Sequence, residues 1–158
     1  MDPKREFLRH TLATIAYRGG KAVRGAPASF ATFLPGPSSR TPVEILSHVG
    51  DLFDWGLSLV SGEERWQSST PHEWDNEVSR FFDTLARLDA YLASDASVEC
   101  SPEKVFQGPI ADALTHVGQI AMLRRLAGAA MRGENYFRAD IAVGRVGADQ
   151  TVPRREFD

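Results

Sequence analysis

The chain has 158 residues, of which 18 are basic and 21 acidic, giving a formal net charge of −3. Its length suits one domain, and 42% hydrophobic with 25% charged residues excludes a disordered or fibrous chain. The balanced charge argues against nucleic-acid binding, which needs clustered Lys and Arg. No apolar run reaches the ~20 residues of a membrane span. The charged start does not resemble a signal peptide, and the single cysteine, Cys100, fits a reducing compartment. We expect one soluble cytoplasmic domain over residues 1–158, without nucleic-acid or membrane partners.

A capping residue followed by proline marks four helix starts. These are Asp2-Pro3, Thr41-Pro42, Thr70-Pro71 and Ser101-Pro102. Proline suits the first helical position because its missing N–H would be unpaired there. Thr41 and Thr70 are each followed three residues later by a glutamate, which completes a capping box. Because Gly108-Pro109 interrupts the last segment, we expect a short turn at 102–107 and a main fourth helix starting near Pro109.

Apolar residues three and four positions apart follow the first and third starts, as expected of amphipathic helices that share a core. The first stripe is Leu8, Leu12, Ile15, Gly19 and Ala22, and the third is Trp74, Val78, Phe81, Leu85, Leu88 and Leu92. Prolines in residues 26–40 predict a long first loop, and glycines make 132–158 an irregular tail that docks through Phe137, Ile141 and Val143. The prediction is an all-α, antiparallel up-down-up-down four-helix bundle with its core in 2–131.

Two of the helices carry polar residues within their stripes. The second stripe reads Ile45, His48, Leu52, Trp55 and Leu59, and the fourth reads Asp112, His116, Gln119, Leu123 and Leu126. The alternative fourth stripe, Ala113, Val117 and Ile120, runs into Arg124, so the polar stripe is taken as the inward one. His48 and His116 each lie seven residues after their predicted starts, about 10 Å into helices that would run parallel. We therefore predict that His48, Asp112 and His116 meet in one layer of the bundle.

Buried polar groups of this kind need a partner, and a divalent metal would serve all three. Two imidazoles and one carboxylate suit Zn²⁺, Ni²⁺ or Fe²⁺, with positions left open for water or substrate. The alternative is a hydrogen-bonded cluster without metal, in which Asp112 pairs with His116 near a helix start. Gln119 is expected either to orient a ligand or to cap the core.

Two segments, TPVEILSH at 41–48 and DALTHVGQ at 112–119, resemble the DinB-like family of helical-bundle metalloproteins. Members of that family carry one His on the second helix and His-x-x-x-His on the fourth, often with a Gln three residues on. His48, His116 and Gln119 match, whereas Asp112 stands where the family has His. The resemblance extends to about residue 131 and implies a metal-binding bundle, commonly dimeric. Relatives include transferases and isomerases that use low-molecular-weight thiols. A decayed metal site is the alternative interpretation of Asp112.

Two classes of function follow. The first is a metalloenzyme whose site at His48, Asp112 and His116 activates a thiol or water for transfer or hydrolysis on a small molecule, with loop 26–40 as lid or substrate wall. The second is a non-catalytic bundle, either a homodimeric scaffold or a binding module. Whether the chain is an enzyme is left open. The remaining polar candidates are expected at the solvated surface: His10, His72, Arg124 and Arg125. The alternative for Arg124 and Arg125 is that they hold the carboxylates of an anionic cofactor.

Overall fold

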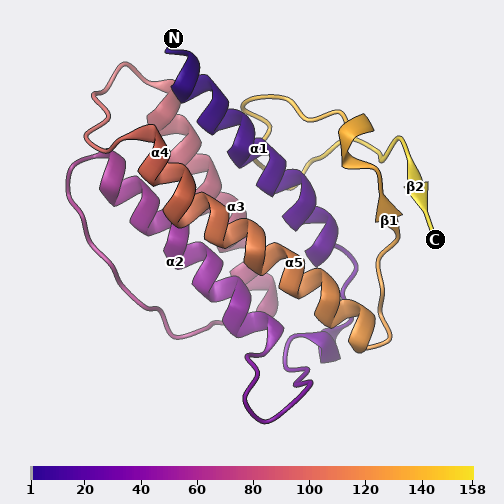
Figure 1. The fold of residues 1–158 in the computed structure, drawn as a ribbon. Coiled ribbons are helices and arrows are strands. Elements are labelled where there is room, and N and C mark those ends of the chain that lie inside the picture. Colours follow the sequence, from indigo (N-terminus) through magenta and orange to yellow (C-terminus); the bar gives the residue numbers. More distant parts are fainter. Residues whose placement is uncertain (1) are drawn as a thin grey trace.

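The computed structural model describes residues 2–158, which are mainly α-helical (Figure 1). The long helices are α1 (Pro3–Val23), α2 (Pro42–Val60), α3 (Trp74–Ala93) and α5 (Ala111–Leu126). The short elements are η1 (Ala28–Phe30), α4 (Pro102–Val105), η2 (Phe106–Ile110), β1 (Gly133–Glu134), η3 (Tyr136–Arg138) and β2 (Glu156–Phe157). The two strands pair antiparallel, with Gly133 opposite Phe157. No helix of residues 2–158 is both long enough and apolar enough to cross a membrane.

Three of the four predicted caps form. Asp2 accepts a hydrogen bond from Lys4 N, Ser101 accepts one from Lys104 N, and Thr41 makes the full capping box with Glu44. The capping box predicted at Thr70 is wrong, because α3 begins only at Trp74.

Contacts with α2 and α3 explain why residues 70–73, just before α3, are not helical. The Asp51 carboxylate accepts hydrogen bonds from the backbone N–H and the hydroxyl of Ser69, at 2.9 and 2.6 Å. Two turns into what would have been the helix, Glu77 accepts the N–H of His72 at 2.8 Å. These contacts hold the chain extended along α2 as far as α3.

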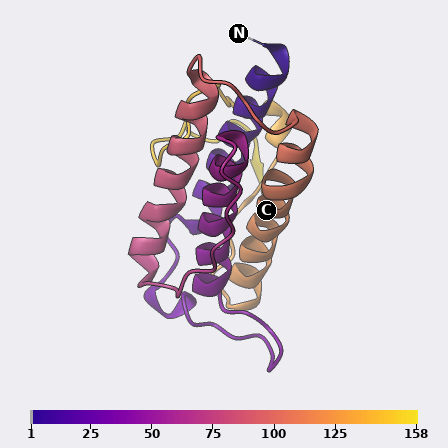
Figure 2. The same cartoon turned by 90° about the vertical axis from the view of Figure 1, so that its left-hand side faces the viewer.

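Helices α2 and α3 run in the same direction. Arg80 contacts Asp51 and Arg87 contacts Asp54, each at 2.6 Å, so later residues of α3 meet later residues of α2. The predicted up-down-up-down order is therefore wrong. Residues 61–73, here called the crossover segment, return along the whole length of α2 before α3 starts (Figure 2). An extended segment of roughly 13 residues spans about 43 Å, more than the about 28 Å of α2, so parallel packing is sterically available.

The two remaining long helices run opposite to α2 and α3. Arg9 of α1 pairs with Asp89 near the end of α3, while Gly19 lies against Phe81. In the same way α5 is antiparallel to α2. A Cβ on Gly19 would lie 2.5 Å from the Phe81 ring, so this glycine permits the close approach of α1 to α3.

The last helix is one continuous run from 102 to 126, rather than a turn followed by a new helix at Pro109. Residues 106–110 form a π-helical turn, in which the Ala111 N–H reaches the Phe106 carbonyl. In a regular α-helix the Pro109 ring would clash with the carbonyl four residues earlier, and Pro109 has no N–H to donate. The wider turn accommodates both effects, so proline shifts the local hydrogen bonding without ending the helix.

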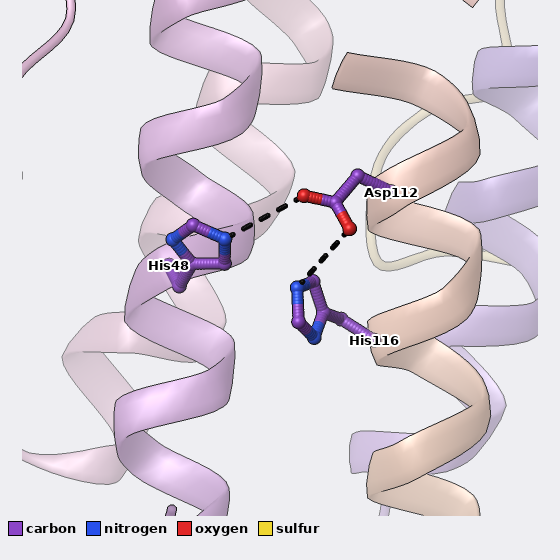
Figure 3. Close-up of side chains that lie close together, drawn as sticks. All are labelled: His48, Asp112 and His116. Atoms are coloured by element: carbon purple, nitrogen blue, oxygen red, sulfur yellow. Dashed lines mark ion pairs between the residues drawn. The ribbon is translucent and has the colours of Figure 1, made fainter. Parts of the chain in front are cut away.

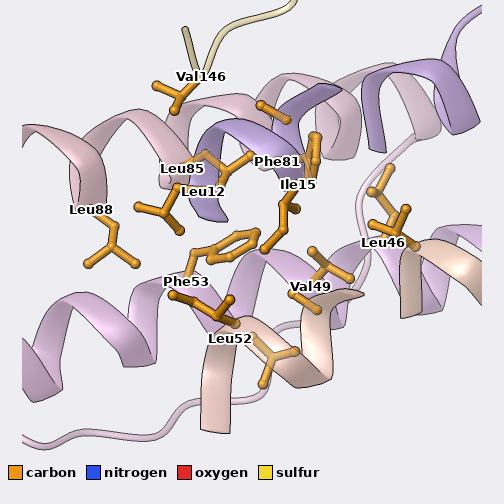
Figure 4. Close-up of a cluster of buried hydrophobic side chains, with 14 of the residues drawn as sticks. Leu12, Ile15, Leu46, Val49, Leu52, Phe53, Phe81, Leu85, Leu88 and Val146 are labelled. Atoms are coloured by element: carbon orange, nitrogen blue, oxygen red, sulfur yellow. The ribbon is translucent and has the colours of Figure 1, made fainter. Parts of the chain in front are cut away.

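The core lies between α1, α2 and α3, closed by α5 (Figure 4). The stripes predicted for the first and third helices are confirmed, with Trp74 and Val78 only partly buried. On α5, however, the inward face is the stripe set aside in the sequence analysis. Its members Ala113, Val117, Ile120 and Arg124 are all buried, and of the polar stripe only Leu123 is buried with them.

Burial of Arg124 explains the wrong choice of stripe. Its guanidinium donates to the carbonyls of Ala22, Arg24 and Ala129, at 3.1, 2.7 and 2.9 Å. Carbonyls at the end of a helix such as α1 lack intrahelical partners, and a buried arginine supplies donors for them. Arg124 is therefore a structural residue of the interior and not part of a solvated face.

The tail docks on α1 through charged and polar groups. Glu134 is buried and accepts hydrogen bonds from the Tyr17 hydroxyl at 2.6 Å and from Lys21 Nζ at 2.7 Å. Phe137 and Val143 do not dock as expected, since Phe137 is 88% exposed and Val143 is also exposed. Ile141 does pack against the core, and Val146 is the buried apolar residue of the tail.

Acidification is expected to loosen this tail. A hydrogen bond from Lys21 lowers the pKa of Glu156 below its ordinary value. The unfolded chain then binds more protons than the folded chain, so the stability this contact adds is present above pH of about 4.5 and is lost as pH falls. Hydrogen-exchange protection of the Asn135 amide, which donates to Arg155 O in the tail, should decrease between pH 6 and pH 3.5.

Glu156→Gln should remove much of that pH dependence, whereas Glu64→Gln in the exposed crossover segment should leave it unchanged. Equal protection at both pH values in the unmodified chain would contradict this role of Glu156.

Candidate metal centre

His48, Asp112 and His116 come together in the structure (Figure 3). His48 projects from α2, and the other two residues lie one turn apart on α5. The Asp112 carboxylate lies between the imidazoles, with one oxygen 3.7 Å from His48 Nε2 and the other 3.4 Å from His116 Nε2. One ligand atom from each residue lies within 4.8 Å of the others.

The three residues meet in a surface groove, not in an interior layer. The exposed fractions of the side chains are 22% for His48, 48% for Asp112 and 13% for His116. The prediction of a fully buried layer is wrong, because the polar stripe of α5 faces the edge shared with α2 while its apolar stripe faces the core. Because these groups are only partly desolvated, leaving them without a partner costs less free energy than it would in a fully buried layer.

The two histidines are level for a different reason from the one predicted. Equal depths counted from the two helix starts would bring the histidines level only if α2 and the last helix were parallel, as predicted. The helices are antiparallel: His48 lies beside His116, whereas Gly56, later in α2, lies against Pro109, earlier in the last helix. His48 is in the first half of α2 and His116 in the second half of the run 102–126, so antiparallel packing makes them neighbours.

Gln119 contacts one of the two ring nitrogens of His116. Its side-chain oxygen lies 2.7 Å from His116 Nδ1. When Nδ1 carries the proton and donates it to Gln119, Nε2 is left as the free lone pair, and this is the nitrogen beside Asp112. This is the contact that a ligand-orienting role of Gln119 requires. The alternative role of capping the core is not seen, because Gln119 is exposed.

The surroundings of His48 favour its neutral form. Partial burial lowers the pKa of His48, and the nearby His116 and Arg40 lower it further, against smaller opposite effects of Asp112 and Asp51. A metal ion binds the neutral imidazole and competes with protons for it. The environment therefore keeps His48 in its ligating form at neutral pH.

An aromatic wall stands beside His48. The ring of Trp66, in the crossover segment, meets the His48 ring edge-on at a centroid distance of 5.7 Å and the Trp55 ring at 5.9 Å. Sequence reasoning missed Trp66. A tryptophan within the otherwise polar stretch 61–70 was the available signal, but its position depends on the anchoring of Ser69 by Asp51.

A cleft of about 540 Å³ opens next to the histidines. Its apolar walls come from the two flanking helices, and Pro35, Ser39 and Arg40 contribute the side formed by the first loop. Loop 26–40 is thus a wall of the cleft, as one of its two predicted roles required. Phe30 of the same loop is buried in the core, which fixes the loop against the helices.

The other sequence candidates lie elsewhere. His10 and His72 are exposed, as expected, and Cys100 is partly buried against the core and unpaired. Asp112 lies in the first turn of α5 and within 3.4 Å of His116, as its alternative role required, but α5 continues the helical run that begins at Pro102, so this turn is not a free helix start.

The donor set fits a divalent transition metal. A tetrahedral ion with bonds of about 2.1 Å separates its ligand atoms by about 3.4 Å. The two carboxylate–imidazole separations, 3.4 and 3.7 Å, are close to that value but involve different carboxylate oxygens. Because the three ligand atoms as a set lie within 4.8 Å of one another, the side chains would have to move closer together to share one ion. Comparisons of the chain with protein-family models, curated proteins and solved structures found no match.

Proposed function

We propose that the chain is a divalent-metal-binding protein related to the DinB-like family, with His48, Asp112 and His116 as ligands for Zn²⁺, Ni²⁺ or Fe²⁺. The observation that carries the proposal is the convergence of two imidazoles and a carboxylate at the edge of an open cleft. A structural metal site is normally closed by four protein ligands, whereas a catalytic site keeps a position free. Three ligands beside a cleft correspond to the second type.

The proposed activity is metal-dependent transfer or hydrolysis on a small molecule, with a low-molecular-weight thiol or water as the nucleophile. A bound divalent ion supplies the Lewis acidity that lowers the pKa of such a nucleophile. Gln119 would hold the His116 ring, and the Asp112 charge would make the centre less electrophilic than three imidazoles would. Trp66 and loop 26–40 would limit access of bulk water. A homodimer remains part of the proposal on the family resemblance.

A non-catalytic cluster is the competing function, and one observation favours it. Asp112 already lies within ion-pair distance of both histidines, so it can accept a proton-bearing N–H from either ring without any metal. The two functions differ in what Asp112 does, and substitutions there separate them.

The affinity for Zn²⁺ or Ni²⁺ is expected to depend on the chemistry of residue 112. Asp112→Ala should weaken binding at least tenfold, because a ligand is lost. Asp112→His should retain binding, because an imidazole at this position can still reach an ion held by His116 one turn away. Isothermal titration at pH 7 with each ion measures both effects.

Circular dichroism of each variant provides the control for folding. In a cluster without metal, Asp112→Ala would instead change stability by a few tenths of a kcal/mol. Equal metal affinity of the unmodified chain and Asp112→Ala would reduce the site to two histidines and remove the main support for an enzyme.

A further inference from the structure

One cation at the cleft, the exposed Arg40, has no hydrogen-bonding partner in the described part of the chain, although its charge helps to lower the pKa of the nearby Glu44 and His48. Arg40 lines the cleft, and within residues 2–158 its side chain forms no hydrogen bond or ion pair. The nearest acidic neighbour along the chain, Glu44, is already engaged, since its carboxylate accepts hydrogen bonds from the N–H and hydroxyl of Thr41 at 2.7 and 2.9 Å. Among the residues described, no carboxylate lines the cleft, and the nearest acidic group of the candidate metal centre, Asp112, lies at its edge beside His48 and His116.

The backbone at Arg40 is held in place. Thr41, the next residue, is the N-cap of α2, and the Val43 N–H donates to Ala31 O across the loop at 3.1 Å. On the other side, Ser39 N–H closes a turn onto Gly36 O at 3.1 Å. The arginine side chain therefore starts from a fixed point at the cleft, near the positive end of the α2 dipole.

The rest of the cleft is mostly apolar. Ile45 of α2 and Leu123 of α5 line it and are buried, while Met122 of α5 lines it and is 57% exposed. A cleft of about 540 Å³ lies within the range of sites for small molecules, where apolar walls supply contact area and a few polar groups fix orientation. Here the polar groups are Arg40, whose backbone is held at one side, and His48, His116 and Gln119 at another.

We propose that the cleft binds a small organic acid, with its carboxylate on the Arg40 guanidinium and its apolar body against Ile45, Met122 and Leu123. The guanidinium presents donors in a planar fork that matches a carboxylate. This assignment specifies the substrate class of the proposed enzyme and rests on that proposed function, but Arg40 and the apolar walls do not require the ion. Binding can therefore be tested in metal-free protein.

The test uses hexanoate as the probe and chelator-treated protein labelled with [¹³C-methyl]methionine. Met122 lies in the cleft, while Met131 packs against the core elsewhere and is an internal reference. Hexanoate should shift the Met122 methyl resonance in a saturable way and leave Met131 unchanged. The neutral analogue hexanol should bind at least fivefold more weakly.

Arg40→Gln should weaken hexanoate binding at least fivefold and bring it close to that of hexanol. The matched control is Arg125→Gln, which removes an exposed arginine of α5 that does not line the cleft and should change nothing. Equal hexanoate affinity of Arg40→Gln and the unmodified chain would overturn the proposal, as would equal affinity for hexanoate and hexanol.

Repeating the titration with Zn²⁺ separates this inference from the proposed function. If Arg40-dependent binding occurs without metal but no ion binds the histidines, the acid-binding cleft stands and the metal centre fails. If the ion binds, and the affinity for hexanoate changes with Zn²⁺ but is the same in Arg40→Gln as in the unmodified chain, the metal centre stands and this inference fails.

Discussion

Replacing His48 or His116 with alanine is expected to abolish retention of a divalent ion. Unmodified protein dialysed against Zn²⁺ or Ni²⁺ should keep about one ion per chain, because two imidazoles and a carboxylate offer ligand atoms within 4.8 Å of one another. Each alanine variant keeps two of the three ligands. His48→Ala leaves Asp112 and His116, both on α5, and His116→Ala leaves His48 on α2 and Asp112 on α5. Elemental analysis of protein purified without a histidine tag measures the stoichiometry.

His10→Ala is the matched control, since His10 is exposed on α1. It removes one imidazole from the surface and should leave the stoichiometry unchanged. Full retention in both His48→Ala and His116→Ala would place any bound ion elsewhere and reject the proposed centre.

Substitution of Arg124 by methionine is expected to cause the largest loss of stability. Methionine keeps the apolar stem but removes the donors to three carbonyls at the ends of α1 and α5. The bond to Ala22 O is buried and the bonds to Arg24 O and Ala129 O are partly buried. Leaving a buried group unpaired costs about 1–3 kcal/mol, and partly buried groups cost less, so we expect a net loss of about 3 kcal/mol in the free energy of unfolding. For a chain of this size the melting temperature should fall by about 6–12 °C.

Arg125→Met tests whether position matters more than charge. Arg125 is the next residue along α5 and is exposed, so its substitution should change the free energy of unfolding by less than about 0.5 kcal/mol. Urea unfolding of both variants gives the comparison. Similar losses at 124 and 125 would mean that Arg124 is solvated and that the inward stripe of α5 has been assigned wrongly.

Local signals in the sequence were sufficient for most helices. Capping residues and apolar stripes are read within a few turns, so α1, α2 and the core face of α3 could be predicted from them. The same signals failed where a distant contact competed with them. Thr70 and Glu73 form a capping box by sequence, but Asp51 of α2 holds Ser69 and keeps the chain extended.

Arg124 shows how the choice between two stripes went wrong. Both α5 stripes have helical spacing, and a charged residue at the end of one argued against burial of that stripe. Its burial depends on the free carbonyls at the end of α1, about a hundred residues away in the chain, which no local pattern reveals. The polar stripe was assigned to the interior for that reason, although it lies along the groove.

The sequence by itself determined which residues form the candidate metal centre and which helices carry them. His48 is one turn past a capping box, and Asp112 and His116 share a helix face by spacing alone. Only the tertiary structure decided the direction of α3, the exposure of the centre, and the positions of Trp66 and Arg40 beside it. Helix formation depends on neighbours three or four residues away, whereas helix direction depends on whether a connecting segment can span the bundle. The crossover segment is long enough to do so, and its course is set by contacts with α2 that form only in the folded chain.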